Sequence, residues 1–178
     1  MSLAVRPASP ADIPAITKIY AHHVIFGLAS FEEIPPDEVE MMSRHTEVVA
    51  RGLPFLLACE RDGTVLGYAY ANLYRQRSAY RFTLEDSIYV APTALRRGIG
   101  RRLLGALVEQ SAAAGYRQMI AVIGDSENAP SINLHEQMGF RHAGVLEATG
   151  FKHGRWVDSV LMQRALGAGA TTKPEAGR

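Results

Sequence analysis

Residues 87–105 read S-I-Y-V-A-P-T-A-L-R-R-G-I-G-R-R-L-L-G, a spacing of glycine and arginine that could bind phosphate. Strand-forming residues come first, and a turn with Gly98 and Gly100 leads into leucines at helical spacing. The first turn of a helix leaves backbone N–H groups free, and these bind anions with the helix dipole behind them. Because glycine lets the backbone approach the anion without a Cβ in the way, the stretch predicts a pyrophosphate cradle. Four side chains add positive charge around it: Arg96, Arg97, Arg101 and Arg102.

Two familiar phosphate-binding motifs are excluded by the residues around this turn. A Walker loop needs a lysine after its last glycine, and Arg101 stands there instead. A Rossmann fingerprint needs a third glycine at the position of Leu103. What remains is a G-x-G sequence after a basic turn, which ordinary loops also contain. The flanking residues therefore decide between a cradle and a plain connection.

A carboxylate precedes the turn by about a dozen residues. Glu85 lies in T-L-E-D-S-I-Y-V, among residues that favour a strand, and partial burial there would raise its pKa. A carboxylate of raised pKa can act as a general base, for instance toward an amine. On the residues alone, the alternative is an exposed position of a half-solvated strand. Asp86 is expected to point to the opposite face, because side chains alternate along a strand.

The cysteine and the other histidines give little indication of a nucleophile or of a metal site. Cys59 is the one cysteine, which excludes an intramolecular disulfide and a cysteine zinc site, and its apolar neighbours indicate a core position. His22 and His23 are adjacent and cannot share one face of a helix. Three other histidines lack a partner at ligand spacing: His45, His142 and His153. The sequence therefore predicts no metal site.

The composition indicates a globular protein of one domain. The chain has 178 residues, of which 47% are hydrophobic and 21% charged, which is typical of a protein with a real core. A formal net charge of +1 argues against a dedicated nucleic-acid binder. Since there is no signal-type segment and no run of about 20 apolar residues, we expect a soluble, cytoplasmic protein without a membrane partner. We expect one domain over residues 1–166 and a flexible tail over residues 167–178, which are rich in Gly, Ala, Thr and Pro.

Periodicity and turn residues place the elements that must position these groups. Strands are expected at residues 3–6, 55–60, 65–73, 82–90, 116–123, 140–146 and 156–164. Helices are expected at residues 10–27, 36–51, 97–114 and 129–138. Asp62 and Gly63 predict a hairpin turn, and residues 151–155 are expected to connect the last two strands. The pattern favours an α/β (α+β) fold with a mixed, mostly antiparallel central sheet flanked by helices.

Several motifs in a fixed order resemble the GCN5-related N-acetyltransferase (GNAT) family. The order is S-F-E-E-I-P-P, R-Q-R-S-A-Y, T-L-E-D-S-I-Y-V, R-R-G-I-G, A-V-I-G, N-A-P-S-I-N-L-H-E-Q-M-G-F and G-F-K-H-G-R-W-V-D. Within the family, these motifs are most similar to the branch of phosphinothricin and methionine sulfoximine acetyltransferases. The likeness covers nearly the whole chain except the tail, and it implies the GNAT fold.

The resemblance implies acetyl-CoA as co-substrate and assigns residues to three roles. Glu85 matches the catalytic glutamate, and His135 stands where many members have a tyrosine that protonates the leaving thiolate. The cofactor residues are Ile88, Tyr89, Val90, Leu95, Arg96, Arg97, Gly98, Ile99, Gly100, Arg101, Asn128 and Ser131. The substrate residues are Phe31, Arg75, Arg77, Tyr80 and Lys152.

Three of these assignments have a second interpretation or depart from the family. Leu95 replaces a Gln or Arg that the family usually carries, but this position acts largely through its backbone N–H. His135 is either a general acid or a packed polar residue of its helix, and the residues favour neither. Asn128 caps a helix as well as matching a cofactor contact, and the two roles are compatible.

The sequence thus predicts an N-acetyltransferase that acts on the primary amine of a small amino acid or analogue by direct attack on the thioester. Two alternative functions are possible on the sequence: an acetyltransferase of protein N-termini or polyamines, and a CoA-binding sensor without catalysis. Glu85 argues against a sensor, and the basic segment at Arg75 and Arg77 argues against a polyamine substrate. The aromatic residues at 31 and 151–156, with the resemblance, predict a homodimer.

Overall fold

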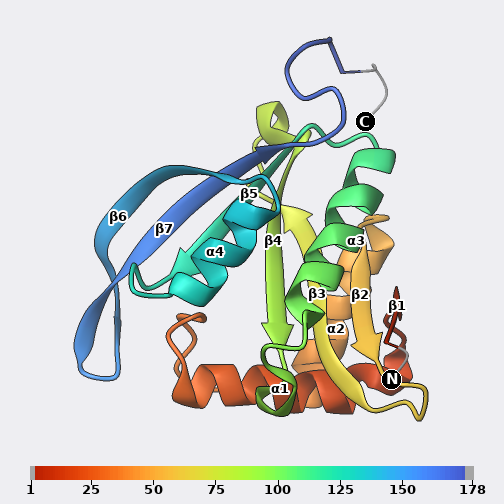
Figure 1. Cartoon of the computed structure of the whole chain (residues 1–178), viewed down its shortest axis with the longest axis vertical. Helices are drawn as coiled ribbons and strands as arrows, with labels where there is room; N and C mark the ends of the chain where they lie inside the picture. Colours follow the sequence, from red (N-terminus) through yellow and green to blue (C-terminus); the bar gives the residue numbers. More distant parts are fainter. Residues whose placement is uncertain (1–2, 175–178) are drawn as a thin grey trace.

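In the computed structural model, which describes residues 3–174, one mixed sheet runs through the molecule (Figure 1). Its order is β1-β2-β3-β4-β5-β7-β6. The strands are β1 (Ala4–Pro7), β2 (Phe55–Cys59), β3 (Val65–Leu73), β4 (Thr83–Val90), β5 (Gln118–Gly124), β6 (Arg141–Lys152) and β7 (Arg155–Ala165). The α-helices are α1 (Ile13–Phe26), α2 (Glu38–Ala50), α3 (Ile99–Ala113) and α4 (Ala129–Gln137).

Neighbouring strands are antiparallel except at the centre, where β4 and β5 run parallel. A parallel pair needs a crossover, and α3 supplies it. The helices cover both faces: α3 and α4 lie in front of the sheet in Figure 1, and α1 and α2 pack on the other side. The predicted fold class is therefore confirmed.

Helix α3 is fixed to the sheet by the periodicity that predicted it. Leu103, Leu104 and Leu107 are all fully buried and recur at the spacing of one helix face. Burying a leucine side chain stabilises the fold by about 1.5–3 kcal/mol relative to leaving it in water. The start of α3, next to the glycine turn, is thus held firmly at the end of β4.

The N-terminal helix begins with a cap that the residues before it predict. Pro10 opens a short 3₁₀ turn, and the Asp12 carboxylate accepts hydrogen bonds from the backbone N–H and the hydroxyl of Ser9, both at 2.8 Å. Arg6 adds two further bonds to the same carboxylate at 2.7 and 2.8 Å. The hydrogen bond from Arg6 chiefly holds the pKa of Asp12 far below its usual range. These contacts fix the start of α1 against β1.

One expected boundary is wrong. Residues 151–155 were expected to connect the last two strands, but β6 continues to Lys152 and only His153 and Gly154 form the turn. The extension passes through an irregularity between Leu146 and Gly150, where Asp158 accepts a hydrogen bond from the backbone N–H of Ala148 at 2.9 Å. Pairing with β7 overrides the weak strand preference of Ala, Thr and Gly in this segment.

The residues after β7 are held to the body of the protein by the buried Leu166 and by Arg117, which precedes β5. Arg117 donates to the carbonyl oxygens of Gly169 and Lys173, each at 3.2 Å, and to Thr172 Oγ1 at 3.0 Å. The domain boundary at residue 166 and the flexibility of the tail stay predictions, and residues 175–178 lie outside the described residues. Over residues 3–174, every helix is too short or too polar to cross a membrane.

Candidate active site

The parallel strands separate in the middle of the sheet. The pairing of β4 with β5 runs from Thr83 opposite Gln118 to Asp86 opposite Ala121, and there it ends. Beyond this point β5 continues beside β7, while residues 87–90 of β4 stay paired with β3 alone. A cavity of about 480 Å³ opens at the split. The edge of β4 that faces it therefore offers backbone N–H and C=O groups to a ligand.

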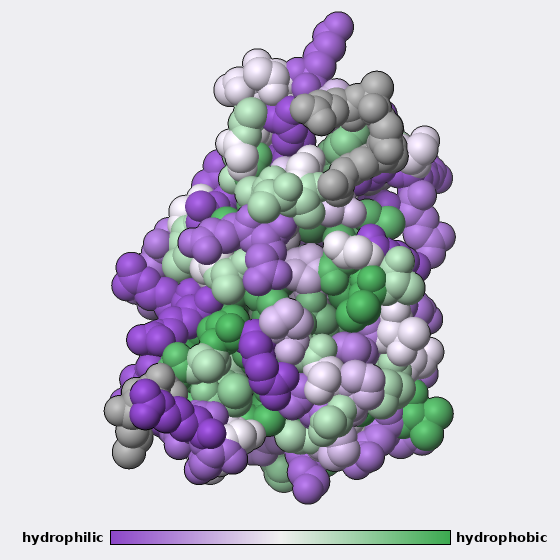
Figure 2. Space-filling view, turned by 90° about the vertical axis from the view of Figure 1, so that its right-hand side faces the viewer, coloured by the Kyte–Doolittle hydropathy of each residue, from purple (hydrophilic) through white to green (hydrophobic). Residues whose placement is uncertain are grey.

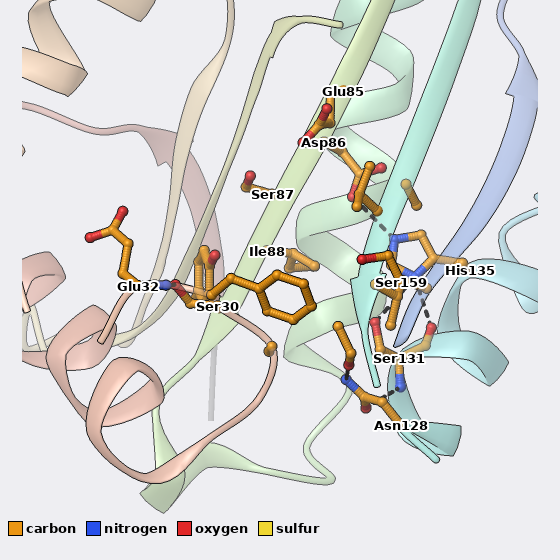
Figure 3. A pocket seen from close by; sticks show the side chains of 17 residues that line it. Ser30, Glu32, Glu85, Asp86, Ser87, Ile88, Asn128, Ser131, His135 and Ser159 are labelled. Carbon is orange, nitrogen blue, oxygen red and sulfur yellow. Dashed lines mark hydrogen bonds and ion pairs between the residues drawn. The ribbon is translucent and has the colours of Figure 1, made fainter. Parts of the chain in front are cut away.

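The walls of this cavity come from the loop after α1, from α4 and from strands of the sheet, including Ser159 of β7 (Figure 3). Residues 29–32, which follow α1, lie on one side, and the start of α4 lies on the other. Between them lie the ends of β4 and β5. The side chains that line it and belong to the predicted site are Phe31, Glu85, Ile88, Tyr89, Asn128, Ser131 and His135.

Glu85 faces the cavity at the last paired part of β4. Its carboxyl group is half-buried, and burial raises its pKa, with the charge of neighbouring Asp86 adding to the rise. Arg75 opposes this effect only in part, because its positive charge lowers the same pKa. A carboxyl group of raised pKa is a better proton acceptor than an ordinary surface glutamate. The geometry suits the predicted role of general base.

His135 and Asp86 form a buried pair at the other side of the split. His135 Nε2 lies 3.1 Å from Asp86 Oδ2, and His135 Nδ1 donates to the carbonyl oxygen of Ser131 at 2.7 Å. Burial by itself would lower the pKa of His135, but the hydrogen bond and charge of Asp86 outweigh it and raise that pKa. Both interpretations of His135 are therefore compatible with the structure: it is packed, and it lines the cavity.

The predicted phosphate cradle has the expected backbone at its first glycine. Gly98 has φ of 73°, a left-handed conformation that suits glycine, and no atom lies within 4 Å of where its Cβ would be. The amide of Arg102 bonds to the carbonyl oxygen of Gly98, so the N–H groups between them lie at the free helix start. Leu95, Arg96 and Arg101 are exposed around this turn.

Three residues of the predicted cradle have structural roles as well. Gly100 is closely packed, because a Cβ there would come within 3.0 Å of a methyl group of Leu134 on α4. Its small size therefore serves the packing of α3 against α4, in addition to any approach of an anion. Arg97 is paired with Glu60 at 2.5 Å, which neutralises part of the positive charge at the turn. Ile99 is buried and anchors the first turn.

The start of α4 confirms the cap that the sequence indicates. Asn128 Oδ1 accepts a hydrogen bond from the backbone N–H of Ser131 at 3.3 Å, and Asn128 Nδ2 donates to the carbonyl oxygen of Gly124. Both residues line the cavity while they hold the helix start. A cofactor contact at this place stays a prediction.

Two predicted substrate residues meet at the loop between α1 and α2: Phe31 belongs to this loop, and Lys152, the last residue of β6, contacts it. Phe31 lies in the cavity wall, against Gly150 of β6, where an added Cβ would come within 2.5 Å of the ring. Lys152 lies outside the cavity wall and is buried, and its Nζ donates to the carbonyl oxygen of Ser30 at 2.6 Å. Burial lowers the pKa of Lys152. The contact ties the end of β6 to the loop that carries Phe31.

The other three predicted substrate residues lie at a distance from the cavity wall. Arg75, Arg77 and Tyr80 are exposed on the connection between β3 and β4. The Arg75 guanidinium stacks on the ring of Tyr74, 4.9 Å from its centre. This connection follows Leu73, which pairs with Leu84, so it emerges at the end of β4 that carries Glu85. The charge of Arg75 acts on Glu85 and lowers its pKa, whereas Arg77 is exposed further along the same connection.

Sequence reasoning missed several groups at the site. Ser30, Glu32 and Ser159 line the cavity, and Asp86 contacts His135. Glu32 accepts hydrogen bonds from Tyr20 at 3.0 Å and from Arg44 at 2.7 Å, which braces the loop next to Phe31. The one sequence feature that could have indicated some of these groups was the polar run around Phe31. Within residues 3–174, no group of three or more His, Cys, Asp or Glu side chains could hold a metal ion.

A sheet whose central parallel strands separate beside a glycine turn and a helix start is the architecture of N-acetyltransferases that use a CoA thioester. The chain belongs to the acetyltransferase (GNAT) family, whose model matches residues 18–140. The resemblance predicted from the motifs is therefore confirmed.

The chain is similar to proteins of the predicted branch over nearly its full length. It is 58% identical to a phosphinothricin N-acetyltransferase of Alcaligenes faecalis, over 96% of this chain and 86% of the relative. It is 38% identical to an L-methionine sulfoximine/L-methionine sulfone acetyltransferase of Pseudomonas paraeruginosa, over 93% and 96%. A crystal structure of a phosphinothricin acetyltransferase from Sinorhizobium meliloti in complex with acetyl-CoA matches with a TM-score of 0.96. That protein is 48% identical, and the match covers 99% of this chain and 95% of the other.

The glycine turn can be tested with a charge at Gly98. Gly98→Asp and Gly98→Asn have nearly the same size, and both residue types tolerate the left-handed conformation. Because only aspartate repels a phosphate at the helix start, we expect Gly98→Asp to bind acetyl-CoA about 10- to 100-fold more weakly than Gly98→Asn, on the basis of about 1.5–3 kcal/mol for a hydrogen bond to a charged group. Isothermal titration gives the two Kd values. Equal affinity of the two variants would contradict a phosphate site at this turn.

Proposed function

We propose that the protein is an acetyl-CoA-dependent N-acetyltransferase, which transfers an acetyl group to the primary amine of a small amino acid or analogue. Phosphinothricin, methionine sulfoximine and methionine sulfone define the substrate type. The observation that carries this proposal is the split between β4 and β5, which combines an open strand edge with a carboxyl group of raised pKa. The curated relatives named above act on amino-acid analogues of this kind, which supports it further.

Residues of the split and the glycine turn would hold the donor. The edge of β4 from Ile88 to Val90 is unpaired with β5 and suits the amide groups of a pantetheine arm, although His23 Nε2 already bonds to the carbonyl oxygen of Val90 at 2.9 Å. The start of α3 suits the pyrophosphate. Acetyl-CoA supplies the activated acyl group as a thioester. Cys59 is buried in β2, so direct attack by the amine fits better than an acylated cysteine.

Glu85 would accept the proton that the substrate amine must lose, directly or through one water. Arg75 and Arg77 would bind the substrate carboxylate at the rim, because a guanidinium offers a planar pair of donors that matches it. His135 would act on the departing sulfur from the α4 side. We further propose a cytoplasmic location, where acetyl-CoA is available to such an enzyme.

Glu85→Gln tests the general base. The amide keeps the size of the side chain and removes its basicity, so kcat should fall about 10²- to 10⁴-fold while the affinity for acetyl-CoA stays nearly unchanged. Because burial raises the pKa of Glu85, the wild-type rate should fall with decreasing pH as the carboxylate becomes protonated, and the variant should lose this acidic limb. Release of CoA thiol against pH measures both effects. Glu136→Gln, on the exposed side of α4, is the control. Normal turnover of Glu85→Gln would assign the base elsewhere.

Arg77→Ala tests recognition of the carboxylate. We expect KM for methionine sulfone to rise about 10- to 100-fold, since a hydrogen bond to a charged group contributes about 1.5–3 kcal/mol. Masking the carboxylate as an amide should cost the wild type similarly and cost the variant little more. Arg81→Ala, in the same connection, is a matched control, because Arg81 bonds to the carbonyl oxygen of Ser78. If wild type and variant both prefer the amide, the pocket binds a peptide or a simple amine.

We also infer a homodimer from the exposed aromatic residues of the β6–β7 hairpin. The hairpin extends away from the body of the molecule at the lower left of Figure 1. Phe151 and Trp156 are 57% and 63% exposed, and their rings contact each other edge to face at 5.3 Å. The face in Figure 2, which looks from the right-hand side of Figure 1, mixes hydrophilic and hydrophobic residues. An exposed aromatic pair on one arm favours burial against another chain.

The dimer can be tested by light scattering at micromolar concentration. Wild type should have twice the mass of one chain, and Trp156→Ser should weaken association at least about tenfold, because buried aromatic residues dominate interface energies. Val39→Ser removes an apolar side chain of α2 that is even more exposed than Trp156, and it should leave the mass unchanged. A monomeric wild type would contradict the inference.

A further inference from the structure

Asp86 and His135 lie 49 positions apart in the chain and form an ion pair that is shielded from solvent. The two residues are 6% and 2% exposed. Asp86 is the last residue of β4 that pairs with β5, so the pair lies at the point where the strands separate (Figure 3). Both side chains belong to the wall of the cavity. Nothing in the proposed roles of Glu85, Arg75 or Arg77 explains why a second carboxylate should be buried here.

The hydrogen bonds determine where the protons of the histidine are. The carbonyl oxygen of Ser131 can only accept, so His135 Nδ1 carries a hydrogen. Nε2 then faces Asp86 Oδ2 at 3.1 Å, so one proton lies between these two atoms. With that proton on Nε2, the pair is an imidazolium beside a carboxylate. The raised pKa of His135, in which the contribution of Asp86 outweighs burial, agrees with this assignment.

Few other charges act on this ring. The other titratable side chains in the cavity wall are Glu32, Glu85 and Tyr89. Phe140 borders the ring at 5.0 Å, and Glu136, the next residue of α4, is exposed. Among the described residues, Asp86 Oδ1 has no hydrogen-bond partner. A buried carboxylate oxygen without a partner is unfavourable, so burying Asp86 lowers the stability of the fold. A role for Asp86 must then come from its contact with His135.

We propose that Asp86 is a positioning residue for acetyl transfer: through Oδ2 it fixes the His135 ring and keeps it charged in the wall of the cavity. The proposal rests on the proposed function. When the carbon–sulfur bond breaks, its electron pair goes to sulfur, and the proton held by the Asp86–His135 pair passes to it, directly or through one water, to give the CoA thiol. The amine has lost its proton to Glu85, so one proton leaves the substrate and one reaches the sulfur. After product release, the ring takes a proton from water and Glu85 returns one.

The neutral ring that results has a lone pair on Nε2 directed at an ionised carboxylate. This arrangement is repulsive, and it drives the ring to regain its proton before the next turnover. Without the carboxylate, burial would dominate and lower the pKa of His135. His135 would then be neutral at the pH where Glu85 is an effective base. Asp86 therefore lets a base and an acid be ready together in one cavity.

Asp86→Asn tests this role. The amide keeps the size of the side chain, and its oxygen can still accept from Nε2–H, but the charge is lost. The pKa of His135 should fall, because only burial and the Ser131 contact remain. His135 must be protonated to donate, so the alkaline limb of kcat should move to lower pH, and kcat above neutral pH should fall about tenfold or more. KM for acetyl-CoA should change less than about twofold, because no phosphate or pantetheine contact is altered.

The titration of His135 can be followed by NMR in the enzyme without substrate, with the resonance assigned by its loss in His135→Gln. Asp37→Asn, at the cap of α2, is a control that removes a carboxylate elsewhere and keeps a good cap. The proposal is supported if the resonance of His135 and the alkaline limb shift together in Asp86→Asn alone. A uniform loss of kcat at every pH, with His135 titrating as in wild type, would show a purely structural role.

If Asp86→Asn does not fold, wild type still decides the matter. His135 must titrate above the ordinary histidine value of about 6.5, and a lower value overturns the proposal. The NMR titration also separates this proposal from the proposed function, because it needs no turnover. An enzyme that acetylates no amine but shows a raised His135 titration would refute the function and keep the ion pair.

Discussion

The short pairing of β4 with β5 is the constraint on which the rest of the site depends. Four residues of each strand are paired before the strands separate. Since the two strands are parallel, the chain must cross from the end of β4 to the start of β5, and α3 makes this connection. The edge of β4 that β5 leaves unpaired borders the cavity, whereas the start of α3 lies beside a second hollow lined by Arg97, Gly98 and Arg101. The crossover places this helix start shortly after the end of β4, and the buried leucines of α3 hold it there.

Local signals in the sequence were sufficient for much of this arrangement. The leucine period, the glycine turn, the cap at Asn128 and the hairpin at Gly63 each depend on neighbouring residues, and each has its counterpart in the structure. The order of the motifs along the chain then predicted the family. The end of β6 was missed, because Gly150 to Lys152 resume pairing with β7 beyond the irregularity after Leu146. Such pairing depends on residues that local patterns do not connect.

Local patterns predict the polar contacts of the site even less well, because these contacts join residues that are distant in sequence. Asp86 was expected to point away from Glu85, and it does contact α4, but its histidine partner is far away in sequence. Phe31 packs on Gly150 and Lys152 bonds to Ser30, across more than a hundred residues. No spacing rule connects these pairs. The position of Arg75 close to Glu85 also came from the fold. The sequence of a charged connection is the same kind of sequence whether or not the connection lies near a cavity.

The alternation of a strand explains how two adjacent carboxylates can serve different purposes. Side chains alternate along β4, so Asp86 contacts α4 and Glu85 does not, although both line the cavity at the split. Their charges still interact, and Asp86 raises the pKa of Glu85 as well as that of His135. Both effects act in one direction, so the proposed base and the proposed acid would shift together toward higher pH. A free amino acid presents its amine mainly as an ammonium at neutral pH, and the uncharged amine becomes more abundant as pH rises. One buried carboxylate thus moves the working range of the whole site toward the pH at which its proposed substrate is reactive.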